Sequence, residues 1–494
     1  MVQFPNTPSF TGFFAPSGVE ADVPHLPVIE GAIPADLDGS FYRVHPDPQF
    51  APMYGDDIWF NGDGMITRFI FKDGGVGLKQ RWARTPKFTM EREAGHALFG
   101  AYRNPLTDTE EAKGEVRGTA NTNVMKLGDK LLALKEDSPP VLMDADTLET
   151  IEPVYTFNGQ LKSETFTAHP KIDPITGEMI AFGYEATGFA SDDLFVYFID
   201  GQGQVGREVR LKVPYVSMIH DFAVTQDHLI FPFACYTTSM ERLKAGKVHW
   251  AWDSRLPSMI GVMRRDGDGS DIRWFKGPER CMMHVFNAYS EGDKVTLHAP
   301  FYDSNFFPFF PNVDGSPWNP RKAVSYVRKL TFDLGKPGES WDEEILFPTP
   351  IGDLGKIDLR FTTLPQRYAF TNFFDPARPF DQARAGPVRG PMSNTYGRFD
   401  LHNGTIDRFF AGDTHTLQEC SFVPRRGSSE EGDGYLIGTA SNLAEMRTEL
   451  VIADAQRLGE GELARVHLPF RAAAQVHGCW YDAEQFAPAG EGQA

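Results

Sequence analysis

The sequence predicts an all-β fold, a seven-bladed β-propeller with loops and helices that cap one end of its axis. Three observations favour this fold. Short strand–turn–strand units recur along the chain, and helical periodicity is scarce. The 47 glycines and 36 prolines are spread through the 494 residues without a central linker. Propellers form long single domains, so the length is compatible with one domain.

The strand–turn–strand units are the strongest of these signals. In each unit, two short strands flank a polar turn that contains aspartate or glycine. The units lie at 66–82, 122–134, 169–184, 220–233, 284–299 and 419–439. They recur roughly every 50–65 residues over the first part of the chain, which suits one four-stranded blade each, and about seven blades fill the chain. An array of β-sandwiches is the alternative that this periodicity leaves open.

The predicted propeller domain covers residues 1–486. Two longer inserts, 303–322 and 348–367, are expected to build the cap, and residues 487–494 are expected to form a disordered tail. Hydrophobic residues make up 41% of the chain, enough for a large core. The 40 phenylalanines are mostly core residues, but so many can also line a deep aromatic pocket.

Charge and cysteine usage limit the partners and the compartment. A formal net charge of −19 without a basic cluster disfavours nucleic acid and strong membrane association, so a neutral or weakly charged small molecule is expected. The four cysteines form no CxxC pair, which argues against a cysteine zinc site and for a reduced, cytoplasmic protein. Neither a signal peptide nor a membrane-spanning stretch is recognisable. The oligomeric state stays open.

Three histidines occupy matching positions in the repeated units. His169, His220 and His284 each begin the strand before a turn, and equivalent positions in blades converge on the propeller axis. His477 lies near the C-terminus, where a propeller closes. Imidazole suits iron, zinc, copper and nickel, and an octahedral Fe(II) with four such ligands keeps two positions open for O2. The alternative is a non-catalytic, ligand-binding propeller whose histidines are structural.

Metal-bound imidazoles need hydrogen-bond acceptors for their other nitrogen, and these are commonly carboxylates. Acids at strand ends in apolar or tight surroundings are the candidates. Glu136, Asp353 and Glu419 fit this description. The alternative is that each of them is an ordinary surface acid in contact with solvent.

Five motifs, taken in order, carry a resemblance to a known family. They are GSFYR (39–43), NGDGM (61–65), FVPR (422–425), EGDGY (431–435) and HGCW (477–480). With them, nearly the whole chain resembles the carotenoid cleavage oxygenases. The resemblance implies a seven-bladed propeller with an axial Fe(II). It places the iron ligands at His169, His220, His284 and His477, and two of the supporting glutamates at Glu136 and Glu419.

The third supporting glutamate is replaced in this chain. The family's E-F-P-x-[IV] segment reads DLGKI here, with Asp353 in the glutamate position. Aspartate is one methylene shorter, so a bond to a ligand histidine would need a water or a shift of the backbone. This departure puts the geometry of one ligand in doubt, but not the site.

Within the family, the chain resembles the bacterial lignostilbene and stilbene dioxygenases, whose relatives cleave isoeugenol and vinylguaiacol. The segments that carry this are HPDPQF (45–50), FGAYRNP (99–105), LKEDSP (134–139) and NFFPFFP (305–311). The resemblance implies that Tyr102 and Lys135 grip a phenol oxygen and that Phe60 and Phe307 form aromatic walls. Lys135 and Glu136 are adjacent, so both roles together need an irregular strand end.

The sequence therefore predicts an Fe(II)-dependent dioxygenase that cleaves the C=C bond of a 4-hydroxyphenyl alkene with O2. A stilbene such as lignostilbene or resveratrol would give aromatic aldehydes. Cleavage of isoeugenol or 4-vinylguaiacol to vanillin is the alternative, and an apocarotenoid is a further one. The pair Tyr102 and Lys135 argues against a carotenoid, which has no phenol to bind. No external reductant or nucleotide cofactor is expected.

Overall fold

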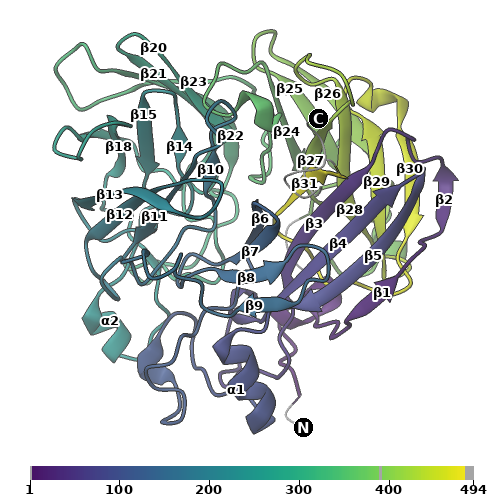
Figure 1. Ribbon diagram of the computed structural model, residues 1–494, viewed down its shortest axis with the longest axis horizontal. Helices are drawn as coiled ribbons and strands as arrows, with labels where there is room; N and C mark the ends of the chain where they lie inside the picture. The colour runs from purple at the N-terminus through teal and green to yellow at the C-terminus, as the bar shows by residue number, and fades with distance from the viewer. Residues whose placement is uncertain (1–2, 389–391, 484–494) are drawn as a thin grey trace, which may run out of the picture.

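The computed structural model describes residues 3–388 and 392–483. Seven sheets of three to five antiparallel strands surround a common axis as the blades of a seven-bladed β-propeller, which confirms the predicted fold class (Figure 1). The tail predicted at 487–494 lies outside the described residues. The prediction of a single domain over 1–486 stays a prediction.

The first four blades follow one another along the chain. Blade one contains β1 (Ala21–Val23), β5 (Gly75–Trp82), β4 (Gly64–Lys72), β3 (Gly39–Pro46) and β31 (Gly478–Asp482). Blade two contains β6 (Asn123–Leu127), β7 (Lys130–Leu134), β8 (Val141–Asp144) and β9 (Thr150–Glu152). Blade three contains β10 (Lys171–Ile172), β11 (Met179–Tyr184), β12 (Asp193–Ile199) and β13 (Val205–Lys212). Blade four contains β14 (Ala223–Val224), β15 (His228–Pro232), β18 (Ser258–Arg264) and β19 (Arg273–Gly277).

The remaining blades complete the ring. Blade five contains β20 (Asn287–Glu291), β21 (Lys294–Tyr302), β22 (Ser325–Asp333) and β23 (Asp342–Ile345). Blade six contains β24 (Tyr368–Phe373), β25 (Thr395–Asp400) and β26 (Thr405–Phe410). Blade seven contains β27 (His415–Pro424), β28 (Gly434–Asn442), β29 (Arg447–Asp454), β30 (Glu462–His467) and β2 (Val28–Gly31).

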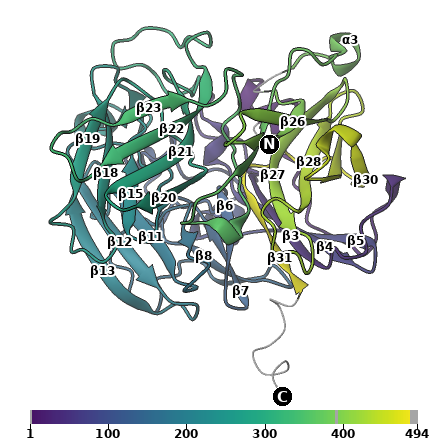
Figure 2. The same cartoon turned by 90° about the horizontal axis from the view of Figure 1, so that it is seen from above.

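The ring closes twice, with one strand from each end of the chain (Figures 1 and 2). The C-terminal strand β31 pairs with β3 of the first blade, where Trp480 lies opposite Phe41. The N-terminal strand β2 pairs with β30 of the last blade, where Val28 lies opposite Val466. Strand pairing by both ends of the chain therefore joins the first blade to the last.

Each interface between neighbouring blades holds its own cluster of buried apolar side chains. Seven such clusters fill the seven interfaces among the described residues. One cluster packs Ile180 of blade three against Leu229 of blade four, and another packs Leu297 of blade five against Ile260 of blade four. The core is therefore a ring of flat layers around the axis, which leaves the axis itself to polar side chains.

Insertions between strands carry the few helices and a small extra sheet. The helices are α1 (Pro86–Ala94), α2 (Met240–Lys244) and α3 (Gln382–Ala385), and the extra sheet pairs β16 (Tyr236–Thr237) with β17 (Ala251–Trp252). Short 3-10 helices include η3 (Trp59–Asn61) and η5 (Leu359–Phe361). No helix among the described residues is long and apolar enough to cross a membrane.

Candidate metal centre

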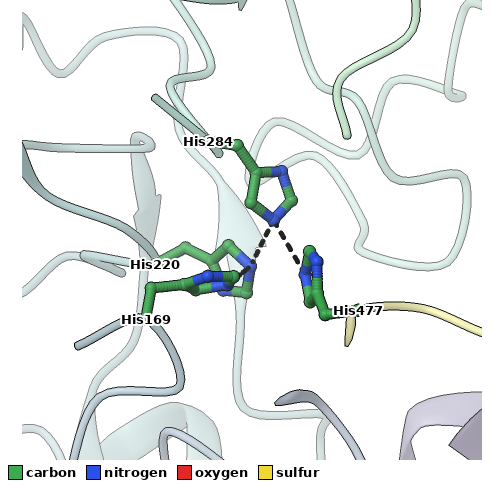
Figure 3. A group of neighbouring side chains, drawn as sticks. All are labelled: His169, His220, His284 and His477. Carbon is green, nitrogen blue, oxygen red and sulfur yellow. Dashed lines mark hydrogen bonds between the residues drawn. The ribbon is translucent and has the colours of Figure 1, made fainter. Parts of the chain in front are cut away.

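Four histidines converge on the propeller axis. His169, His220, His284 and His477 each offer a ring nitrogen, and these four nitrogens all lie within 4.8 Å of one another. Figure 3 shows the imidazoles turned toward one another. The Nε2 atoms of His169 and His220, of His220 and His284, and of His284 and His477 are each 3.1 Å apart.

The four histidines lie just before strands of blades three, four, five and one, so His169, His220 and His284 are not the first strand residues that they were predicted to be. His169 precedes β10, His220 precedes β14, His284 precedes β20 and His477 precedes β31. Outside a strand, a side chain is not bound by the alternation that sends neighbours to opposite faces. These positions therefore let all four rings point at the axis.

Three carboxylates occupy the outer side of the centre. The Nδ1 atoms of His220, His284 and His477 lie 2.5 Å from Glu136 Oε2, 2.7 Å from Asp353 Oδ2 and 2.7 Å from Glu419 Oε1 respectively. A carboxylate acceptor assigns the ring proton to Nδ1. Each Nε2 of these three histidines therefore presents a lone pair to the axis.

The charges of this arrangement favour a bound cation. Burial alone would raise the pKa of Glu136 and Glu419, but the neighbouring basic side chains lower the pKa of both to about 2. Burial lowers the pKa of His477 to about 3, and it holds the pKa of His169 far below its usual value. Ring nitrogens whose lone pairs face each other at 3.1 Å repel one another unless a metal ion lies between them. The donor set thus fits a divalent transition metal.

The shorter side chain of Asp353 reaches His284 directly, without the intervening water considered from the sequence. Two glycines explain how. A Cβ atom on Gly355 would overlap the ring of Phe286, and one on Gly352 would overlap the backbone oxygen of Asn372. The backbone on both sides of Asp353 therefore packs closer than any larger residue would allow. This close approach makes up for the missing methylene.

Glu419 is held by further basic groups. Arg43 Nη1 lies 3.3 Å from Glu419 Oε2, which also accepts the backbone N–H of Gly478 at 3.0 Å. Lys356 Nζ lies 3.2 Å from Oε1. These contacts keep the carboxylate ionised and fix its direction, so His477 cannot rotate freely.

Asp221 braces three ligand segments and was not singled out from the sequence. Its Oδ1 pairs with Lys171 Nζ at 2.7 Å, and its Oδ2 accepts the backbone N–H of Val285 at 3.0 Å. Lys171, Asp221 and Val285 follow His169, His220 and His284 closely in the chain. The only available signal was the HD dipeptide at 220–221. It is a weak signal, because aspartate after histidine is common elsewhere.

The predicted phenol-binding residues lie together in the structure. Lys135 and Tyr102 are 3% and 5% exposed, and Lys135 Nζ lies 4.9 Å from the centroid of the Tyr102 ring. Lys135 Nζ donates to the backbone oxygen of Phe60 at 2.8 Å. The rings of Phe60 and Phe307 meet edge to face at 6.2 Å. Strand β7 ends at Leu134, which supplies the irregular strand end that the adjacent roles of Lys135 and Glu136 require.

The inserts predicted as a cap have two different positions. The first, 303–322, brings Phe307 beside Phe60. The second, 348–367, carries Asp353 to His284 and packs against blade five, where Asn287 Nδ2 donates to the backbone oxygens of Phe361 and Leu364. The second insert thus supports the metal centre from the side of the carboxylates.

Comparisons with known proteins find relatives that match nearly the whole chain. The family model described as retinal pigment epithelial membrane protein matches residues 14–482. The lignostilbene-α,β-dioxygenase isozyme III of Sphingomonas paucimobilis is 43% identical over 98% of this chain and 99% of its own length. The isoeugenol monooxygenase of Pseudomonas nitroreducens is 39% identical over 96% of this chain and 98% of its own. The crystal structure of Pseudomonas brassicacearum lignostilbene dioxygenase matches with a TM-score of 0.94 and 39% identity, covering 98% of this chain and 100% of that one.

Proposed function

This chain belongs to the carotenoid cleavage oxygenase family, and from that premise we propose that it is an Fe(II)-dependent dioxygenase acting on stilbenes. The substrate carries a 4-hydroxyphenyl group conjugated to the C=C bond that O2 cleaves, as in lignostilbene or resveratrol. The products are two aromatic aldehydes. The observation that carries the proposal is the grouping of Lys135 and Tyr102 beside aromatic walls, in a chain that also gathers four histidines.

Iron is the metal that we assign to His169, His220, His284 and His477. Imidazole suits iron among the transition metals, and four neutral imidazoles would hold an Fe(II) ion without reducing its charge. When bound, iron supplies the activation of O2 that organic side chains cannot provide. Glu136, Asp353 and Glu419 hold the rings in the tautomer that binds metal.

The phenol oxygen is held by Lys135 and Tyr102 in this proposal. Burial lowers the pKa of Lys135, whereas the carboxylates of Asp137 and Glu136 counteract that effect and favour the ammonium form. An ammonium group beside a phenol favours the phenolate. Negative charge on the phenol oxygen moves electron density through the ring into the alkene and prepares it for oxidation.

The aromatic side chains next to Lys135 favour a flat aromatic substrate. Phe60 and Phe307 are partly buried, and their rings meet each other and the ring of Phe309 at centroid distances of 4.9–6.2 Å. Aromatic rings stack on one another edge to face or offset, which positions the substrate ring and excludes water. A stilbene has two such rings, whereas isoeugenol has one, so this wall area favours the stilbene.

We further propose that the protein works in the cytoplasm on small molecules. All four cysteines are unpaired, which suits a reducing compartment. O2 and the phenolic alkene are the only partners that the reaction requires.

The test follows absorbance over time in air. Protein loaded with Fe(II) receives a 4-hydroxystilbene, isoeugenol or 4-vinylguaiacol in separate cuvettes, with His220→Ala as the control. Loss of the stilbene band with the appearance of two aldehydes supports the proposal. Aldehyde from the two short alkenes alone moves the substrate to phenylpropenoids. No reaction with any of the three despite bound iron points to a carotenoid-like or other alkene, and no reaction without bound iron favours a non-catalytic propeller.

A further inference from the structure

A buried arginine lies next to Tyr102 and takes no part in the function proposed above. Arg103 is 2% exposed and has a φ of +52°, in the left-handed region that non-glycine residues avoid. Such a conformation persists only where the surroundings hold the residue firmly, and it is enriched at functional sites. The contacts of Arg103 show which groups it holds together.

The guanidinium of Arg103 lies between two carboxylates, those of Glu185 and Glu136. Nη2 donates to Glu185 Oε2 at 2.8 Å, and Nη1 donates to the Tyr184 hydroxyl at 2.8 Å. Nη1 also lies 3.5 Å from Glu136 Oε1, the carboxylate whose other oxygen contacts His220. Arg103 is therefore in contact with the outer side of the metal centre.

A second group of contacts secures the backbone of Arg103 and Tyr102. His249 Nδ1 lies 3.0 Å from the Arg103 backbone oxygen. The His249 backbone N–H donates to the Tyr102 backbone oxygen at 3.4 Å. His249 Nε2 lies 2.9 Å from Glu185 Oε2. Glu185 has a φ of +51°, so both ends of its ion pair with Arg103 are in the left-handed conformation.

The charge balance around Lys135 depends on the same arginine. Three acidic side chains surround Arg103, with Glu185 at 2.8 Å, Glu136 at 3.5 Å and Asp137 at 4.0 Å. Without Arg103, Lys135 would be the cation that remains next to Glu136 and Asp137. A lysine paired with them would be drawn away from a phenol, because buried opposite charges attract strongly.

We propose that Arg103 is a positioning residue that holds the Tyr102 and Lys135 clamp at a set place relative to the metal ligand His220. It does so through the backbone of Tyr102 on one side and the Glu136 carboxylate on the other. The proposal rests on the proposed function for the role of the clamp. Its contact with the metal centre can be tested without any substrate.

The experiment compares Arg103→Lys and Glu185→Gln with the wild type in two assays. The first titrates Co2+ into metal-free protein and records the visible absorption of the bound ion, which reports its affinity and ligand geometry. The second measures KM and kcat for a 4-hydroxystilbene with the iron-loaded enzyme. Arg117→Lys is the matched control, because Arg117 is a partly buried arginine that donates to the backbone oxygen of Ala101 and pairs with Asp108 but contacts none of the metal-centre carboxylates.

Arg103→Lys is expected to weaken Co2+ binding about tenfold with an altered spectrum, because lysine cannot span Glu136 and Glu185 together. KM for the stilbene should rise about tenfold in the same variant. Glu185→Gln should change both quantities in the same direction by a smaller factor, and Arg117→Lys should stay within about twofold of the wild type.

Unchanged Co2+ affinity and spectrum in Arg103→Lys would overturn the proposal, as would an equal effect of Arg117→Lys. A change in KM alone would also overturn it, since the arginine would then not connect the clamp to the metal centre. If the wild type cleaves no stilbene, the proposed function fails. The Co2+ titration still decides whether Arg103 supports the metal centre.

Discussion

Lys135 and Glu136 are neighbours with different tasks. Lys135 lies beside the Tyr102 ring, whereas Glu136 accepts from His220. In a regular strand, one of the two would point to the opposite face of the sheet. Because β7 ends at Leu134, both side chains are buried on the inner side of the blade.

Replacing Lys135 by methionine keeps the length and removes the charge. We expect turnover of a 4-hydroxystilbene to fall about 100-fold or more, because the phenolate loses its cation. The iron content measured by mass spectrometry should not change. Lys130→Met, at the partly buried start of the same strand, is the control. Turnover close to that of the wild type would contradict the role of Lys135 as the phenolate partner.

Asp353 offers a less intuitive substitution. Changing it to the glutamate typical of the family adds a methylene group where Gly352 and Gly355 already bring the backbone close. The longer side chain should push against His284, costing about 1–3 kcal/mol by overpacking. We expect weaker metal binding and a lower Tm than in the wild type, measured by metal titration and calorimetry. A higher metal affinity of Asp353→Glu than of the wild type would show that aspartate holds His284 less well than glutamate does.

At the scale of elements, the Tyr236 hydroxyl is an anchor of the loop at 305–311. The Tyr236 hydroxyl accepts the backbone N–H groups of Phe306 and Phe307 at 3.1 and 3.2 Å, and it donates to Asn305 Oδ1 at 2.8 Å. The small sheet of β16 and β17 thereby fixes the loop. An apolar loop without regular structure needs such an anchor, because buried backbone N–H groups require partners.

Tyr236→Phe removes only this oxygen. The Phe306 N–H loses its acceptor, at a cost of about 1–3 kcal/mol, and the Phe307 N–H keeps only Asn305 Oδ1 at 3.1 Å, so the Phe307 ring becomes less ordered. We expect KM for the stilbene to rise about fivefold to tenfold with little change in kcat. Tyr215→Phe is the control, since the Tyr215 hydroxyl donates to the Pro257 backbone oxygen outside this loop. An equal rise of KM in both variants would contradict the anchoring role.

At the scale of the whole molecule, the four metal ligands come from blades one, three, four and five. Their convergence therefore depends on a closed ring. Blade seven contributes to closure through β2 and is stabilised by a buried acid, Glu449. Glu449 pairs with Arg465 at 2.6 Å and with His415 at 3.2 Å, which connects β29, β30 and β27.

Glu449 makes the stability of this blade dependent on pH. Burial would raise its pKa, but hydrogen bonds from His415, Arg465 and Asn442 lower the pKa to about 2. The stabilisation is therefore complete above the unfolded pKa of about 4.5 and is lost as the pH falls toward 2. Glu449→Gln should reduce the free energy of unfolding by roughly 3 kcal/mol at pH 7.

Urea unfolding at pH 7 and at pH 3 tests this expectation, with the exposed Glu460→Gln as the control. The difference between the wild type and Glu449→Gln should shrink at pH 3, because the wild-type carboxylate is then losing part of its advantage. A difference that stays constant between the two pH values would assign the loss to packing and not to charge.

Much of the architecture was predictable from local signals. The strand–turn–strand units at 66–82 and 122–134 coincide with β4–β5 and β6–β7, because apolar strands and turn residues act over a few neighbouring positions. The repeated place of His169, His220 and His284 in those units predicted that they meet. His477 became a candidate through its place near the C-terminus, and the carboxylates through their places at strand ends; the family motifs then assigned their roles.

What the tertiary structure alone decided depends on contacts between residues far apart in the chain. β2 is exposed along its whole length and has no strand pattern of its own, and only β30 of the last blade gives it a partner. The reach of Asp353 depends on how closely two glycines pack against Phe286 and Asn372. The role of Arg103 depends on Glu136 and Glu185, which blades two and three bring to it. Distances of this kind follow from closing the ring of blades, so no local property of the sequence could predict them.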